Sequence, residues 1–215
     1  MAVYDLEEQE QIAQLKAWWA QYGNLVVSVL LALAIGFAGW QVWNRYKSAG
    51  AAEASVLYFE LQQAAAVGDA AQAREIAGKM ISKHGNTVQA QLGALLSAGV
   101  QFQGNDLDNA RPHLEWAAEK GKDAVLRDLA RLRLAVVLLQ QGAFEDALAR
   151  LQPAPEGELR ARFEDLRGDT LAAQGRAAEA RAAWEAALGA LGNVVNDANA
   201  NLRSVIRAKL ESLEG

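Results

Sequence analysis

The sequence predicts an all-α protein with one membrane-spanning helix near the N-terminus, followed by a stack of helical hairpins and a final capping helix. Three observations support this fold class. An apolar segment without any charge covers the 19 residues 25–43. Beyond residue 50, a turn residue followed by an alanine recurs four times. Alanine is the best helix former and supplies much of the 52% apolar composition, while only three prolines interrupt the 215 residues.

The apolar segment is long enough to cross a bilayer as one helix. At about 1.5 Å of rise per residue, its 19 residues span about 28 Å, close to the roughly 30 Å hydrocarbon core of a membrane. The nearest full charges are Lys16 and Arg45, so the whole segment can lie in lipid. We therefore predict a short N-terminal segment at 1–23, a transmembrane helix at 24–44 and a linker at 45–50.

Aromatic residues flank the segment on both sides, as is typical of a spanning helix whose rings lie at the two membrane interfaces. The residues before the span also recur at helical spacing with Ile12 and Leu15. The N-terminal segment therefore either lies in the interface plane or extends the spanning helix. The predicted membrane-interface anchors are Trp18, Trp19, Tyr22, Trp40, Trp43 and Tyr46.

A buried core helix and a cleaved signal peptide are the alternatives to an anchor. A core helix rarely runs this far without a charge. Small residues in SAGAA (48–52) could serve a signal peptidase, but a signal peptide opens with a basic region and has a shorter apolar core. Here the first 23 residues carry four carboxylates against one lysine, which favours an uncleaved anchor.

The charges beside the span do not fix its orientation. Lys16 stands before it, and Arg45 and Lys47 stand after it. A literal count of positive charges places the C-terminal part in the cytoplasm by a margin of one, and long domains can cross regardless of such a margin.

The part from 51 to 215 is predicted to be four helix pairs. The alanines are spaced by 37, 37 and 33 residues, near the length of a tetratricopeptide (TPR) unit. Glycine or asparagine stands at each turn, where the left-handed conformation is needed, and a larger residue usually follows each alanine by four positions. The turn residues are Gly68, Asn105, Gly142 and Gly175, the alanines are Ala73, Ala110, Ala147 and Ala180, and the following residues are Ala77, Leu114, Leu151 and Trp184.

Two further features complete this TPR-like solenoid. Pro153 and Pro155 should end the second helix of the third pair early. A final amphipathic helix from about Asn199 should cap the open end of the stack, because each pair buries its apolar face only against a neighbour.

Apolar residues on the first helices of the second and third pairs form a candidate partner groove. Such an apolar face marks an interaction site if it is exposed, but a tightly curled array would bury it as core. The spacing of apolar residues along the helix is the same in both cases, so it does not distinguish them. The residues concerned are Leu92, Leu95, Leu96, Phe102, Leu132, Val136 and Leu139.

Several function classes are disfavoured by the sequence. A net charge of −5 without a basic stripe argues against nucleic acid, and the absence of cysteine excludes disulfides and thiolate metal sites. His84 and His113 lie far apart without metal-ligand spacing, so surface or capping roles are expected. The carboxylates of 156–169 alternate with arginines like a solvated helix face. We predict no enzyme, and no catalytic, metal or cofactor site.

The chain resembles a known family from end to end. The resemblance rests on QLKAWWAQYGN (14–24), GWQVWN (39–44), RLRLAVVLLQQGAFEDALARL (131–151) and, most specifically, DLRGDTLAAQGRAAEARAAWEAAL (165–188). The family is that of the ancillary SecYEG translocon subunits (the YfgM family) of the bacterial inner membrane. The resemblance implies a single-pass type II protein with a cytoplasmic N-terminus and a periplasmic TPR-like domain.

The resemblance also implies partners. Family members associate with the SecYEG translocon and with PpiD, a membrane-anchored chaperone of prolyl-isomerase type, and help to hand exported proteins to periplasmic chaperones. A cytoplasmic stress-response regulator is a further partner that the resemblance suggests. The same sequence features would equally serve a TPR scaffold for another cell-envelope assembly machine.

Overall fold

The protein is described by a computed structural model that covers residues 3–192 and 197–213, with side chains except those of 3–9, 42, 44–49 and 197–198. The chain divides into two compact units, Met1–Gly50 and Ala51–Gly215. Helix α1 (Val3–Ala66) supplies the described part of the first unit and the opening helix of the second. Residues 45–50, the predicted linker, are helical and contain a single glycine.

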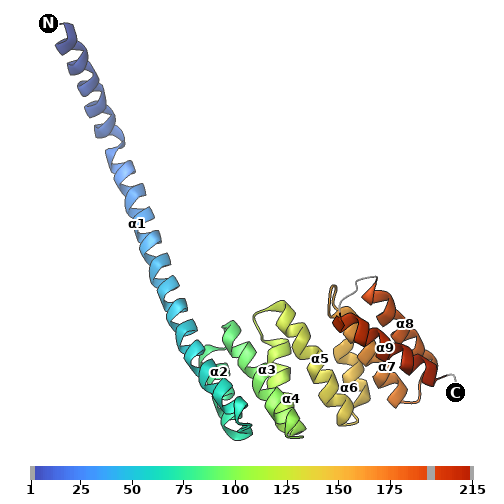
Figure 1. Ribbon diagram of the computed structural model, residues 1–215. Coiled ribbons are helices and arrows are strands. Elements are labelled where there is room, and N and C mark those ends of the chain that lie inside the picture. Colours follow the sequence, from blue (N-terminus) through green and yellow to red (C-terminus); the bar gives the residue numbers. More distant parts are fainter. Residues whose placement is uncertain (1–2, 193–196, 214–215) are drawn as a thin grey trace. The chain divides into compact units, whose positions relative to one another are not determined.

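The second unit is a series of antiparallel helix pairs, which confirms the predicted all-α fold class. Consecutive helices from α2 to α8 pack against each other along the stack in sequence order (Figure 1). The first helices of the pairs are residues 51–66 of α1, α3 (Val88–Gln103), α5 (Ala124–Gln140) and α7 (Arg160–Ala173). The second helices are α2 (Ala70–His84), α4 (Leu107–Glu119), α6 (Phe144–Leu151) and α8 (Ala177–Leu191), and α9 (Asp197–Ser212) follows.

The turns inside the pairs have the backbone conformation that the sequence predicted. Gly68, Gly142 and Gly175 have φ values of 71°, 73° and 76°, and Asn105 takes the same place with φ of 58°. A positive φ is accessible to glycine and, among other residues, mainly to asparagine and aspartate. Helix α6 ends at Leu151, before the two prolines, also as predicted.

The recurring alanines bring the helices of each pair into close contact. All four have no exposed surface, and the residues four positions later are also buried. The contact is tightest in the last pair, where an added Cβ at Gly168 of α7 would overlap the Trp184 ring of α8. Glycine is therefore required at position 168, because the Trp184 indole lies directly against the backbone there.

Helix α9 closes the stack through a polar cluster as well as through apolar packing. Lys209 donates hydrogen bonds to Asp165 and Asp169 of α7 at 2.7 and 2.8 Å, and its Nζ lies 5.9 Å from the Trp184 ring centroid. The indole Nε1 donates to the Asp165 carbonyl and the Asp169 carboxylate. Ile206 of α9 is fully buried in the apolar cluster that α9 forms with α7 and α8. This burial confirms the predicted capping role of the helix. The helix begins two residues before the predicted position.

Candidate membrane span and partner-binding face

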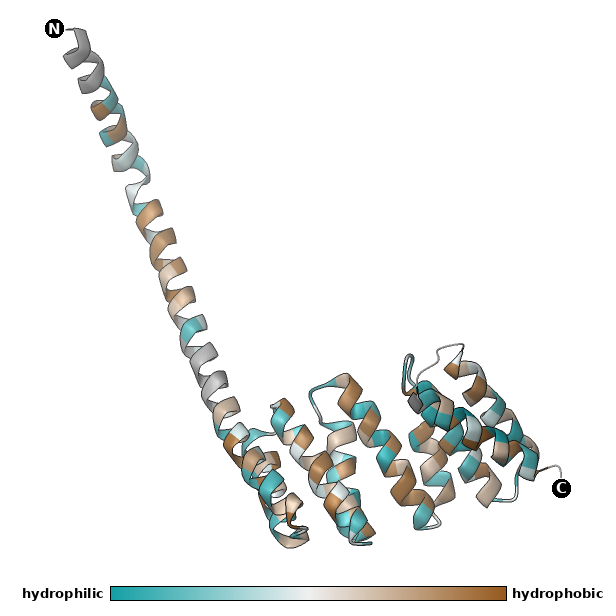
Figure 2. Ribbon diagram, in the orientation of Figure 1, coloured by the Kyte–Doolittle hydropathy of each residue, from teal (hydrophilic) through white to brown (hydrophobic). Residues whose placement is uncertain are grey.

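The first unit contains a helix that is long and apolar enough to cross a membrane. The candidate span is Glu10–Gln41, and only 6% of its apolar window is buried. A core helix of a soluble protein would be mostly covered, whereas large apolar side chains here are exposed, for example Leu33 at 65% and Ile35 at 69%. Figure 2 shows the apolar run as a nearly continuous hydrophobic stretch of α1. The predicted spanning character of this segment is therefore supported by its exposure.

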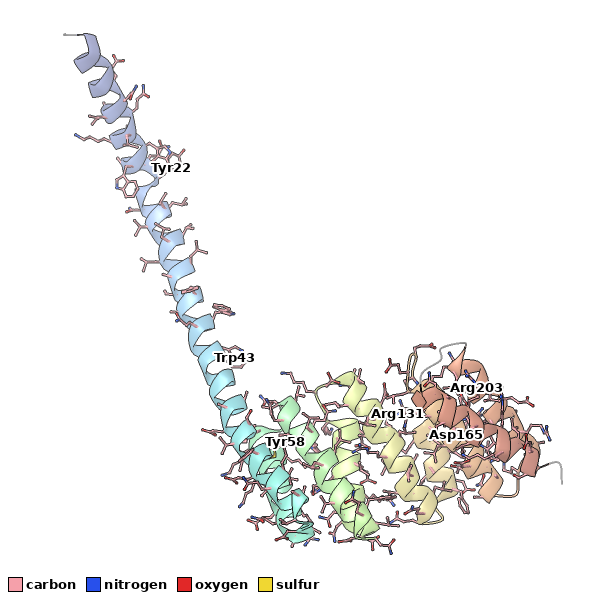
Figure 3. All side chains as sticks on the ribbon, viewed as in Figure 1. Tyr22, Trp43, Tyr58, Arg131, Asp165 and Arg203 are labelled. Atoms are coloured by element: carbon pink, nitrogen blue, oxygen red, sulfur yellow. The ribbon has the colours of Figure 1, made fainter. Side chains whose placement is uncertain are left out.

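Exposed aromatic rings lie toward both ends of this span. Trp18 and Tyr22 have ring centroids 5.8 Å apart at one end, and Trp18 and Trp19 are 6.4 Å apart. Trp40 lies 5.9 Å from Phe37, and the exposed Trp43 follows one turn later (Figure 3). The side chain of Tyr46, the last predicted anchor, lies outside the described side chains. That the aromatic residues act as membrane anchors stays a prediction.

In the second unit, the outward sides of α3 and α5 form a surface with very little charge, which we call the first-helix face. None of its ten residues is buried, and Arg133 is the only charged one, although 22% of the whole chain is charged. Helix α3 as a whole carries no charged residue, whereas α2, α4 and α5 carry four each. The first-helix face consists of Gln89, Leu92, Leu96, Gly99, Gln103, Leu129, Leu132, Arg133, Val136 and Gln140.

The seven residues predicted to line a groove lie at different depths. Leu95 is 4% exposed and belongs to the core. Phe102 and Leu139 are half-buried against that core. Leu92, Leu96, Leu132 and Val136 are half-buried members of the first-helix face. The apolar stripe thus contributes to both core and surface, and whether it binds a partner stays a prediction.

Two hollows open beside this face. The smaller, about 270 Å³, lies between α3 and α5 with Leu114 of α4 at its base, and Gly99, Phe102 and Val136 line it. The larger, about 980 Å³, lies between α5, the α6–α7 loop and the end of α8, and Leu132 lines it. Of the predicted groove residues, Phe102 and Val136 line the smaller hollow and Leu132 lines the larger one.

The arginine at the rim of the smaller hollow is held in place by the neighbouring helix. Arg133 Nη1 donates to the backbone carbonyl of Leu95 on α3 at 3.3 Å. Among the described residues it forms no ion pair with a carboxylate, whereas Arg111, Arg150 and Arg167 each have one. Arg133 therefore presents a positive charge on an otherwise neutral surface.

Two sets of side-chain contacts that fix α5, and with it the first-helix face, were not predicted from the sequence. The fully buried Gln91 of α3 accepts from Asp123 N at 2.8 Å and donates to the carbonyls of Ala117 and Asp123 at 3.1 Å. The second contact centres on Arg131 of α5, which donates to the carbonyls of Arg150 and Pro153 (Figure 3). Its guanidinium also lies 5.2 Å from the centroid of the buried Phe163 ring.

Both histidines are more buried than expected. His84 lies in the last turn of α2, 3.7 Å from Glu53, which agrees with a role at a helix end. His113 is 9% exposed, so the expectation of a surface or capping role is wrong for it. It shares the core face of α4 with Ala110 and Ala117, three positions before it and four after it. Burial lowers the pKa of His113, and the positive charge of Arg74 lowers this pKa further.

The charged side chains have the arrangement of solvated helix faces. The predicted carboxylate–arginine alternation gives ion pairs between Arg160 and Glu156 and between Arg167 and Glu164. Among the described residues, no group of three His, Asp or Glu side chains is placed to hold a metal ion.

Comparisons with known proteins agree with this arrangement. Residues 16–215 match a family described as a tetratricopeptide repeat-like domain. The chain is similar to proteins named ancillary SecYEG translocon subunit from several bacteria. It is 30% identical to that of Escherichia coli (strain K12) over 99% of both chains. It is 30% identical to that of Neisseria gonorrhoeae over 81% of this chain and 84% of the relative, and 28% identical to that of Haemophilus influenzae over 86% and 90%.

Proposed function

Because the chain belongs to the family of ancillary SecYEG translocon subunits, we propose that it is a membrane-anchored, non-enzymatic adaptor at the protein export channel of the bacterial inner membrane. The observation that carries this proposal is the combination of an exposed apolar span with a helical-repeat unit that offers a charge-poor face. An anchor raises the effective concentration of the repeat unit near any partner in the same membrane. Modest affinity is then sufficient for a stable association.

The proposed topology places the N-terminus in the cytoplasm and the repeat unit in the periplasm, a single-pass type II arrangement. The family resemblance favours this topology. The count of positive charges beside the span opposes it by one residue, because Lys16 precedes the span and both Arg45 and Lys47 follow it. Such a margin has little influence on a following domain of 165 residues, since long domains translocate largely regardless of nearby charge.

In this arrangement the repeat unit meets exported proteins as they leave the channel. We propose that it assists them together with a membrane-anchored periplasmic chaperone of the PpiD type. The proposal is supported by the half-buried apolar residues of the first-helix face, because partly exposed apolar surface of this kind is suited to a partner that also exposes apolar residues. The short N-terminal segment is the part that would contact a cytoplasmic stress-response regulator.

Site-specific photo-crosslinking in native membranes tests the proposed function. A photoreactive amino acid at Val136, on the first-helix face, is compared with one at the exposed Gly78 of α2. We expect crosslinks from position 136 to translocon subunits or to a membrane-anchored chaperone, and fewer from position 78. Recovery of unrelated cytoplasmic proteins alone would reject the proposal. Recovery of cell-wall or outer-membrane assembly proteins would favour the scaffold alternative.

A further inference from the structure

We infer that the first-helix face binds an apolar peptide segment whose single charged group is a carboxylate beside its apolar anchor. The anchor side chain enters the hollow between α3 and α5, and the carboxylate pairs with Arg133. This inference rests on the proposed adaptor function and names the chemistry of the segment that the adaptor would bind.

The size and lining of the hollow indicate what enters it. Its volume is about 270 Å³, just below the roughly 300–1,000 Å³ of pockets that hold whole small molecules. Gly99, Phe102 and Val136 line it, with the base formed by Leu114. A mainly apolar hollow of this size on an open surface fits one or two aliphatic or aromatic side chains of a longer chain.

The charge pattern of the face selects among partners. Apolar residues of the segment can cover the nine neutral residues of the face without leaving an ion unpaired, and only Arg133 needs a charged partner. A basic segment would meet Arg133 and find no carboxylate on the face. An acidic group placed beside the hollow would meet the Arg133 guanidinium, which has no carboxylate partner within the described part of the chain and which the Leu95 carbonyl holds at the rim. Charge complementarity therefore favours one carboxylate next to the apolar anchor.

The chain offers a variant that blocks the hollow without disturbing the fold. An added Cβ at Gly99 meets no atom within 4 Å, so the side chain of Gly99→Leu extends into the hollow that this residue lines. Gly78 of α2 is a matched control, because it is also inside a helix and also has open space around an added Cβ. Both changes replace a helix-interior glycine, so both should keep or raise the thermal midpoint.

The test measures peptide binding to the full-length protein in lipid nanodiscs by fluorescence anisotropy, with empty nanodiscs as the blank. The probes are three labelled serine-based nonapeptides with a central Leu-Phe pair, followed by aspartate, asparagine or lysine. We expect the aspartate peptide to bind about two- to fivefold more tightly than the asparagine peptide, the range of an exposed ion pair. The lysine peptide should bind most weakly.

The variants separate the two parts of the inference. Gly99→Leu should weaken the aspartate peptide by at least about tenfold, as expected for loss of one buried apolar side chain, while Gly78→Leu binds like the wild type. Arg133→Gln should abolish the preference for aspartate over asparagine, and Arg133→Lys should retain it. Absence of saturable binding, unchanged binding by Gly99→Leu, or a preference that survives Arg133→Gln would overturn the inference.

Two further results are distinguishable. If Gly99→Leu alters the mass of the assembly measured in the nanodisc, the occupant is a second copy of this chain and the peptide inference is wrong. If the peptides do not bind but crosslinks from position 136 still reach translocon subunits, the inference fails while the proposed function stands. Peptide binding without such crosslinks would support the inference and reject the adaptor role.

Discussion

Replacement of Gln91 by alanine should destabilise the repeat unit more than any exposed substitution on the same helix. Gln91 has no exposed surface, and its amide group makes three hydrogen bonds, one to the last turns of α4 and two to Asp123, the residue before α5. Two of the partners belong to Asp123, whose carboxylate also caps α5 by accepting from Leu126 N at 2.9 Å. The amide therefore fixes the beginning of the helix that carries Arg133 and Val136.

The magnitude follows from the number of bonds. Each intramolecular hydrogen bond contributes about 0.5–1.5 kcal/mol, and a buried group left without a partner costs about 1–3 kcal/mol. With three bonds lost, we expect Gln91→Ala to lower the free energy of unfolding by about 2–4 kcal/mol. In a domain of this size, that loss corresponds to a fall of about 4–16 °C in the thermal midpoint.

The assay is thermal unfolding of the full-length protein in a mild detergent, followed by circular dichroism. Gln89→Ala is the control, since Gln89 lies on the same helix, is only half-buried and makes a single contact of 3.4 Å to Ser55 Oγ. It should change stability by less than about 0.5 kcal/mol. Gln91→Glu keeps the side-chain volume but removes both donated bonds, so it should be at least as damaging as Gln91→Ala. Equal midpoints for the alanine variants at 89 and 91 would refute the reasoning.

Three further predictions concern the core and the C-terminal cap. Gly168→Ala forces a Cβ into the Trp184 ring and should cost about 1–3 kcal/mol in thermal unfolding, whereas a helix glycine with free space tolerates alanine. Lys209→Met leaves Asp165 without its cation and should cost about 1.5–3 kcal/mol. Burial alone would lower the pKa of Lys209, but its two carboxylate partners outweigh burial and raise it. The difference between wild type and Lys209→Met should therefore persist below about pH 10.4 and shrink as the pH rises further; a constant difference across this range would contradict the pairing. Because the pKa of His113 is lowered, the unfolded chain binds more protons below about pH 6.5. Wild-type stability should thus decline as the pH falls through this range, and His113→Asn should show less of this decline in acid titration.

The local parts of the fold could be predicted because each has a local cause. A turn that needs positive φ selects glycine or asparagine, and Asn105 fits this requirement with φ of 58°. A close helix contact selects alanine, and α6 ends at Leu151, two residues before Pro153. These requirements act within a few residues, so they leave a repeating pattern in the sequence.

The contacts that hold the pairs together could not be predicted in the same way. Gln91 bonds to Asp123 across 32 residues, and Arg131 bonds to Pro153 across 22. No regular sequence spacing links Gln91 or Arg131 to its partner, so these contacts leave no pattern in the sequence. The sequence also could not show which apolar residues of α3 and α5 are buried and which are accessible. Leu95 and Leu96 both fit the helical spacing of apolar residues, yet Leu95 is buried and Leu96 is only half-buried. Only the packing of α3 against α5 decides which of them remains accessible.

The side of the membrane on which the repeat unit lies is the most direct test of the account. The chain contains no cysteine, so single cysteines can be introduced at Gln11 and at Glu185, both exposed in the structure. Cells with a permeabilised outer membrane are treated with a membrane-impermeant maleimide, and both variants are recovered from the membrane fraction. The account predicts labelling at position 185 in intact spheroplasts and labelling at position 11 only after lysis. The reverse pattern, or recovery of the protein in the soluble fraction, would contradict it.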